Sequence, residues 1–196
     1  RASIGSVATG RFPHGLRLSP SGGEIYVANV KDGNVSVIDP VALSEVTRIP
    51  VGRAPVQVGF TPDGKQVYVS LRDENSVAVI DTSTRQVIAK VPVGSGPIQV
   101  YATPDGKSVY VANQGSAEQP DSTVSVIDTT TLLVAATIET GPGAHGVVIG
   151  PDGRQAFITN ILDNSVSVID VAMRKVIREF SVGKGPNGDT FRAAGN

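Results

Sequence analysis

The chain has 196 residues, of which 40% are hydrophobic and 5% aromatic, and its formal net charge at pH 7 is -1. Such a small net charge gives no electrostatic basis for binding nucleic acid or an anionic membrane surface. The absence of cysteine excludes disulfides, thiolate metal sites and a cysteine nucleophile. No apolar run approaches the length of a membrane-spanning helix, so no membrane span is predicted.

One short apolar strand recurs four times along the chain. Each copy follows a turn of the Pro-Asp-Gly type and precedes a second strand that ends in Ile-Asp. The four copies occupy residues 26–29, 68–71, 110–113 and 157–160, and the closing aspartates are Asp39, Asp81, Asp128 and Asp170. These aspartates are 42, 47 and 42 residues apart. A repeat of this length indicates a solenoid or a propeller.

The second repeat, residues 51–91, shows how many strands one unit contains. Its runs rich in Val, Ile and Tyr, each bounded by turn-forming residues, predict strands over 56–60, 66–71, 76–80 and 86–91. The run Val-Ala-Val-Ile at 77–80 does not alternate with polar residues, which indicates that both faces of its strand are covered. Four strands in a unit of about 40 to 45 residues are typical of a propeller blade.

The repeated motif also resembles a known family. A Tyr-Val-Ala-Asn strand after Pro-Asp-Gly-Lys, followed by Ser-Val-Ser-Val-Ile-Asp, is similar to the bacterial and archaeal YVTN β-propeller repeat over nearly the whole chain. The family's fold is similar across surface-layer proteins, sugar-lactone hydrolases and domains that hold haem d1. The resemblance implies a β-propeller and an extracytoplasmic location (periplasmic, secreted or cell surface), and it leaves the activity open.

We predict one all-β domain over 1–196, a β-propeller of four-stranded antiparallel blades at about 10–51, 52–93, 94–140 and 141–182. Residues 1–9 and 183–196 are predicted as terminal strands, with a fourth strand at 4–8 and a first strand at 187–192. The missing initiator Met indicates a processed protein or an excised fragment, and the other strands of the terminal blade are missing. The chain would form part of a ring of about seven blades; a compact ring of four is the alternative. Open blade edges then favour self-association.

Strand direction assigns the loops to two faces of the propeller. In an antiparallel blade the blade-to-blade loop and the loop between the second and third strands share one face, here called the loop face. The Pro-Asp-Gly turns lie on the opposite face. The loop face is the more variable, and its loop at 113–122 is five residues longer than the equivalent loops. Since binding sites usually sit on loops held by a rigid scaffold, we expect a protein or small-molecule ligand there.

Both histidines belong to equivalent loops that lead into a first strand. They are expected at the mouth of the central channel, either facing a ligand, a metal or a haem-like group, or donating to a neighbouring carbonyl between blades. The candidate ligand-binding residues are His14, His145, Arg11, Arg72, Asn113 and Asn187. Two histidines without carboxylate or cysteine partners make a poor metal site, so no metal is predicted.

Three function classes fit the sequence. The first is a non-enzymatic binding scaffold that uses the loop face. The second is a propeller that holds a haem d1-like group or a metal through a channel-mouth histidine. The third is a lactone hydrolase, which the lack of an acid-base-nucleophile set disfavours, so no catalytic residue is assigned. The two matches to G-x-G-x-x-G, at 141–146 and 183–188, lie between strands with no helix, so no dinucleotide site is predicted.

Overall fold

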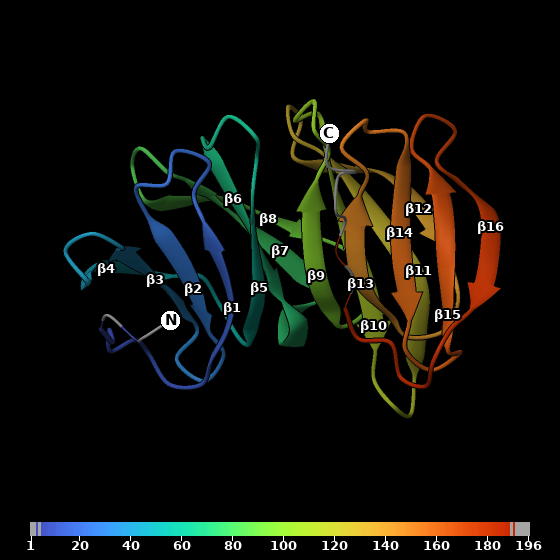
Figure 1. The fold of residues 1–196 in the computed structure, drawn as a ribbon, viewed down its shortest axis with the longest axis horizontal. Helices are drawn as coiled ribbons and strands as arrows, with labels where there is room; N and C mark the ends of the chain where they lie inside the picture. Colours follow the sequence, from blue (N-terminus) through green and yellow to red (C-terminus); the bar gives the residue numbers. More distant parts are fainter. Residues whose placement is uncertain (1–2, 4, 189, 191–196) are drawn as a thin grey trace.

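The computed structural model describes residue 3, residues 5–188 and residue 190. Within this part of the chain, sixteen strands form four antiparallel sheets of four strands each, one sheet per repeat (Figure 1). Blade 1 holds β1 (Pro13–Leu18), β2 (Ile25–Asn29), β3 (Asn34–Asp39) and β4 (Ser44–Pro50); blade 2 holds β5 (Pro55–Phe60), β6 (Gln66–Leu71), β7 (Ser76–Asp81) and β8 (Gln86–Pro92). Blade 3 holds β9 (Pro97–Ala102), β10 (Ser108–Gly115), β11 (Pro120–Asp128) and β12 (Leu133–Glu139); blade 4 holds β13 (Ala144–Ile149), β14 (Gln155–Asn160), β15 (Ser165–Asp170) and β16 (Lys175–Ser181). The predicted all-β class and the four blades are confirmed.

The burial of each strand follows its place in the blade. In blade 2, β6 is buried from Val67 to Leu71 and β7 from Ser76 to Ile80, as expected for strands covered on both faces. The outermost strand β8 alternates between exposed and half-buried residues. Its residues Val87, Ala89 and Val91 therefore face the interior, whereas Gln86, Ile88 and Lys90 meet solvent.

Adjacent blades share one hydrophobic core at each boundary. Tyr26 and Val35 of blade 1 pack with Val58 and Val69 of blade 2, and the boundaries between blades 2 and 3 and between blades 3 and 4 repeat this arrangement. The ring of Tyr26 meets that of Phe60 edge to face, with centroids 5.1 Å apart. We call the face that a blade presents to the next blade its back face, and the face that it presents to the preceding blade its front face.

The four blades follow one another along an open arc. The innermost strands pack in succession, β1 on β5, β5 on β9 and β9 on β13. Blade 1 and blade 4 lie at the two ends of the arc, and both turn one broad face toward the viewer in Figure 1. The alternative of a compact ring of four blades is therefore not what the chain forms.

The aspartate that closes each third strand organises the turn to the fourth strand. The Asp81 carboxylate accepts hydrogen bonds from the Thr84 backbone N–H at 2.8 Å and from the Ser83 hydroxyl at 2.6 Å. These donors, the Ser83 hydroxyl first, lower the pKa of Asp81. The equivalent aspartates each accept from the backbone of the same turn; they are Asp39, Asp128 and Asp170. The predicted role of these aspartates is confirmed.

The structure differs from the prediction at three places. Residues 5–9 form no strand, although a fourth strand was predicted over 4–8, because no third strand is available to complete its ladder. Residues 187 and 188 also lie outside any strand, and the rest of the strand predicted at 187–192 falls almost entirely outside the described residues. The long loop predicted at 113–122 is instead a longer hairpin, in which β10 runs to Gly115 and β11 starts at Pro120. The added residues satisfy their backbone groups by extending the ladder.

Replacing Asp81 with alanine should lower the unfolding midpoint, because the turn donors lose their acceptor. Thermal unfolding followed by circular dichroism would measure the change. Asp163→Ala is the matched control, since Asp163 is exposed and its carboxylate forms no ion pair among the described residues. Equal midpoints for the two variants would contradict the assigned role.

Candidate functional site

Every innermost strand carries a β-bulge at the same place, near the loop face. The register skips between Pro13 and Leu16 in blade 1, and between Ala144 and Val147 in blade 4. The strands β5 and β9 are bulged at the equivalent residues. A bulge leaves one residue unpaired and re-aims the neighbouring side chains. Both histidines lie inside these bulges.

The backbone groups freed by the bulges bond across blade boundaries. His14 Nδ1 lies 3.1 Å from the carbonyl oxygen of Val56, the residue at the equivalent position in blade 2. The Ser70 hydroxyl donates to the carbonyl of Ile98, the equivalent residue in blade 3. The Gln99 side-chain oxygen accepts from the Val147 backbone N–H at 3.1 Å. The loop-face end of the channel wall is therefore joined by polar contacts from blade to blade.

His145 occupies a different environment from His14, which is exposed. Its ring is half-buried, and its Nδ1 is buried without a hydrogen-bond partner among the described residues. Burial lowers the pKa of His145; the neighbouring Asn187 backbone opposes this shift, and the charged form of His14 adds to it. His145 is thus held as a neutral imidazole at neutral pH.

Contacts between loops confirm the predicted arrangement of the loop face. The Arg11 backbone N–H donates to Asp32, which lies between β2 and β3. Asp121 of the long hairpin accepts from the Ser95 backbone N–H at 2.7 Å, and its carbonyl accepts from Gly143 at 2.8 Å. On the opposite face, the Pro-Asp-Gly turns of neighbouring blades lie together, with Gly64 beside Pro20.

The two predicted arginines lie near a hollow between the loops of blades 1 and 2. This hollow has a volume of about 820 Å³ and is lined by Arg72, Arg53, Lys31 and Asp32, among others. Arg11 and Arg72 are each paired with a carboxylate, Arg11 with Asp32 and Arg72 with Asp73. Such exposed pairs contribute little to stability, and they leave the rim with mixed charge.

Asn113 lies elsewhere than predicted. Its side chain is fully buried inside blade 3, where Nδ2 donates to Thr123 Oγ1 and to Ser125 Oγ, both at 3.0 Å. A Cβ added to Gly94 would collide with this amide, so the glycine of the blade-to-blade loop packs directly on it. Asn29 and Asn160 repeat the arrangement. The amide of Asn113 joins a strand pair to a loop and faces no open surface, whereas Asn187 is exposed.

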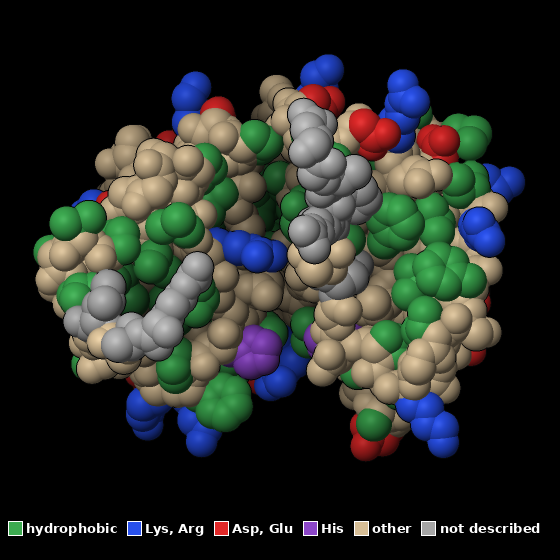
Figure 2. All heavy atoms as spheres, in the orientation of Figure 1, with side chains coloured by type: hydrophobic (Ala, Val, Ile, Leu, Met, Phe, Trp, Pro, Cys, Tyr) green, Lys and Arg blue, Asp and Glu red, His purple; other side chains and the backbone are tan. Residues whose placement is uncertain are grey.

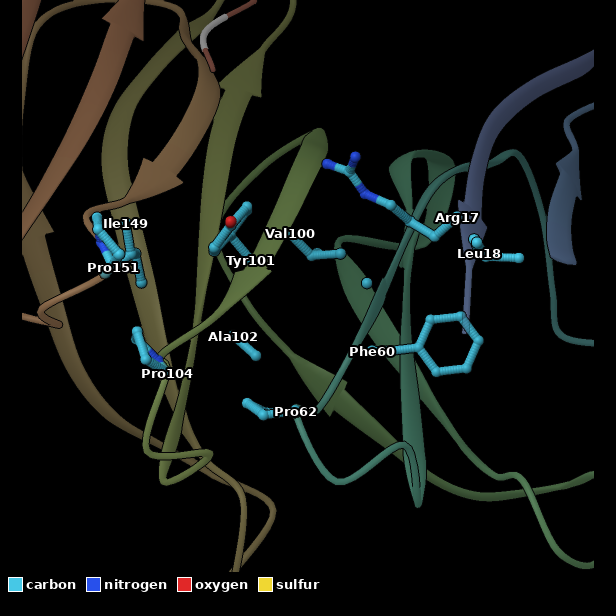
Figure 3. A pocket seen from close by; sticks show the side chains of 11 residues that line it. Arg17, Leu18, Phe60, Pro62, Val100, Tyr101, Ala102, Pro104, Ile149 and Pro151 are labelled. Atoms are coloured by element: carbon cyan, nitrogen blue, oxygen red, sulfur yellow. The ribbon is translucent and has the colours of Figure 1, made fainter. Parts of the chain in front are cut away.

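The sequence did not predict a second hollow, which lies in the channel toward the Pro-Asp-Gly face. Its volume is about 500 Å³, and all four innermost strands contribute to it (Figure 3). Its lining is Arg17, Leu18, Gly59, Phe60, Pro62, Val100, Tyr101, Ala102, Pro104, Ile149 and Pro151. The one signal in the sequence is the fifth position of each first strand, which carries Arg17, Gly59, Tyr101 and Val148.

Four repeated four-stranded sheets around a channel define the chain as a β-propeller protein, and the comparisons with known proteins agree. A model of YNCE-like β-propellers matches residues 115–193, and a model of lactonases with seven-bladed β-propellers matches residues 42–131. Among curated proteins, no sequence matches the chain significantly. No helix in the described part of the chain is long and apolar enough to cross a membrane.

Solved structures give the same class. The chain is similar to hydrazine synthase of Kuenenia stuttgartiensis, with 27% identity and a TM-score of 0.82, over 91% of this chain and 51% of the other. It is also similar in fold to the β-propeller domain of Cps50 (Swd1) of Myceliophteria thermophila, with 13% identity and a TM-score of 0.76, over 93% of this chain and 58% of the other. The chain thus spans only about half the length of these structures.

The neutral state of His145 has a consequence for stability. Because the pKa of His145 is lower in the folded chain than its usual value near 6.5, the unfolded chain binds a proton first as the pH falls. Stability should therefore be fully present above about pH 6.5 and decline below it. His145→Gln should remove this part of the decline, and His14→Gln should retain it. Chemical unfolding at pH 7.5 and pH 5.5 measures both, and a decline unchanged in His145→Gln would refute the assignment.

Proposed function

We propose that the chain is a non-enzymatic interaction scaffold of the YVTN type, in an extracytoplasmic setting, whose partner is a further propeller blade. A second copy of this chain supplies such a blade. The observation that carries the proposal is that apolar side chains are exposed at both ends of the arc, Phe180 and Val182 on blade 4 and Leu16 on blade 1. The loop face, with its mixed-charge rim, is the expected site for a protein or small-molecule ligand of the assembled scaffold.

The uncovered back face of blade 4 is identified by comparison with the other blades. Phe180 on β16 is 40% exposed, whereas Ile49, Val91 and Ile138 at the same position are 4%, 2% and 4% exposed. Val182, just after β16, is also exposed, while its equivalent Val51 is buried. Figure 2 shows hydrophobic side chains gathered over blade 4. This face is built for a next blade.

The front face of blade 1 also exposes an apolar side chain that is buried in the other blades. Leu16 on β1 is 58% exposed, whereas Val58, Val100 and Val147 at the same position are completely buried in the boundary with the preceding blade. Val27 and Ile38 on the same front face are buried, so the exposed apolar surface of blade 1 lies at Leu16 on its innermost strand. At the three boundaries inside the chain, a back face packs against the front face of the next blade. Blade 1 of a second copy offers blade 4 the same kind of front face. Four blades from each copy would give eight, within the usual range for closed rings.

Phe180→Glu and Leu16→Glu should each abolish association between copies, because either change places a charge in an apolar boundary. Analytical ultracentrifugation over a range of concentrations would show a dimer for the natural chain and monomers for both variants. Ile177→Glu is the matched control on the same strand. Ile177 is 46% exposed, and its equivalents Val46 and Ile88 are similarly exposed at 45% and 49%, so this position faces solvent in every blade. A monomeric natural chain, or a dimer that survives both substitutions, would overturn the proposal.

A cofactor-holding propeller is the second candidate, and one contact favours it. The bond between His14 Nδ1 and the Val56 carbonyl leaves Nε2 as the free nitrogen of that ring, the orientation common among metal-ligating histidines. His145 has its Nδ1 buried, so it too could ligate only through Nε2. In this case a haem-like group would be held at the channel mouth by one imidazole.

Titration with haemin tests this candidate by absorption spectroscopy. If a channel-mouth histidine holds the group, a shifted Soret band should appear and His14→Gln or His145→Gln should remove it. A spectrum equal to that of free haemin, or one that the double variant retains, would leave only the structural role of the histidines.

The third candidate, a lactone hydrolase, is supported by the match of residues 42–131 to the lactonase model. That segment contains neither histidine. Within the described residues, no cluster of three or more His, Asp or Glu side chains could hold a metal ion. The match is therefore carried by the blade repeat, and we prefer the scaffold.

A further inference from the structure

The hollow on the Pro-Asp-Gly side of the channel has the composition of a small-molecule site. Its volume of about 500 Å³ lies within the usual range for ligand pockets, roughly 300 to 1,000 Å³. Most of its lining is apolar: Phe60, Ile149 and the prolines of three neighbouring turns. A ligand with an apolar body would lose its hydration there to aliphatic and aromatic side chains.

A single charge faces this apolar lining. Arg17 is the only Arg, Lys, Asp or Glu among the lining residues. The ion pairs in the described part of the chain do not include Arg17. Figure 3 shows its guanidinium extending from β1 into the space that Tyr101 borders from β9. Arginine matches planar carboxylates with two parallel hydrogen bonds.

A glycine occupies one of the inner-strand positions that border this space. Arg17, Gly59 and Tyr101 occupy the same position in β1, β5 and β9. A Cβ at Gly59 would lie 3.1 Å from both Val100 Cγ2 and the Val100 carbonyl oxygen, so the glycine allows β5 and β9 to approach closely. Arg17 and Tyr101 thus stand on either side of a position without a side chain.

We propose that this channel hollow binds a small organic anion, a carboxylate with an apolar, ring-sized body. Arg17 receives the carboxylate, the Tyr101 hydroxyl provides a further donor, and the apolar body rests on Phe60 and Ile149. The site lies at the opposite end of the channel from His14 and His145. It is also independent of the blade contact proposed above, because none of its lining residues is Phe180 or Leu16.

Isothermal titration calorimetry with 1-naphthoate tests the site. The natural chain should bind 1-naphthoate, and Arg17→Met should weaken binding by roughly tenfold or more, as for loss of a charge-assisted hydrogen bond. Arg154→Met is the matched control, because it removes an exposed guanidinium near the same face but outside the hollow. Phe180→Glu should bind like the natural chain, which separates this test from that of blade docking.

Two further probes define the ligand class. The natural chain should bind the neutral analogue 1-naphthalenemethanol at least tenfold more weakly than 1-naphthoate. The affinity for 1-naphthalenemethanol should be the same in Arg17→Met as in the natural chain. Inorganic phosphate should give no measurable heat over the same concentrations, since it has no apolar body. The proposal is overturned if 1-naphthoate does not bind, if Arg17→Met binds it as well as the natural chain, or if phosphate binds as tightly.

Discussion

The structure depends on the packing of one blade's back face against the front face of the next. A four-stranded sheet of Val, Ile and Tyr residues has two apolar faces, and neither can be left in water without cost. Tyr26 and Val35 gain their burial only because blade 2 presents Val58 and Val69 to them. Curvature, channel and loop positions follow from repeating this contact three times.

Buried hydrogen bonds fix the blade-to-blade loops against the sheets that apolar packing brings together. The buried asparagine at the end of the second strand ties two strands to the glycine of a blade-to-blade loop, in blades 1, 3 and 4. Blade 2 has Leu71 there, buried and in contact with the Gly52 position. An apolar side chain can fill the same space, so the asparagine is one of two ways to fix the loop against the sheet.

The repeat period predicted the blades, the turn aspartates and the two faces because each depends on local chemistry and strand direction. Asn113 could not be placed from its sequence, since its burial results from the loop that folds over it. The channel lining was missed for another reason. The bulges at His14 and His145 interrupt the alternation of each first strand, so counting residues across them does not tell which side chains face the channel. Arg17 lies just beyond such a bulge.

The cores shared between blades also determine how the chain should unfold. A core that belongs to two sheets at once makes the boundary, and not the blade, the unit of cooperativity, as in a linear array of coupled repeats. Blades 2 and 3 each belong to two such units, whereas blades 1 and 4 belong to one. Amide protons of the central sheets would then exchange only through larger openings, and those at the ends would exchange by fraying. Joining the ends to further blades would remove this difference in amide exchange between central and terminal blades. A closed ring would then unfold as one cooperative unit.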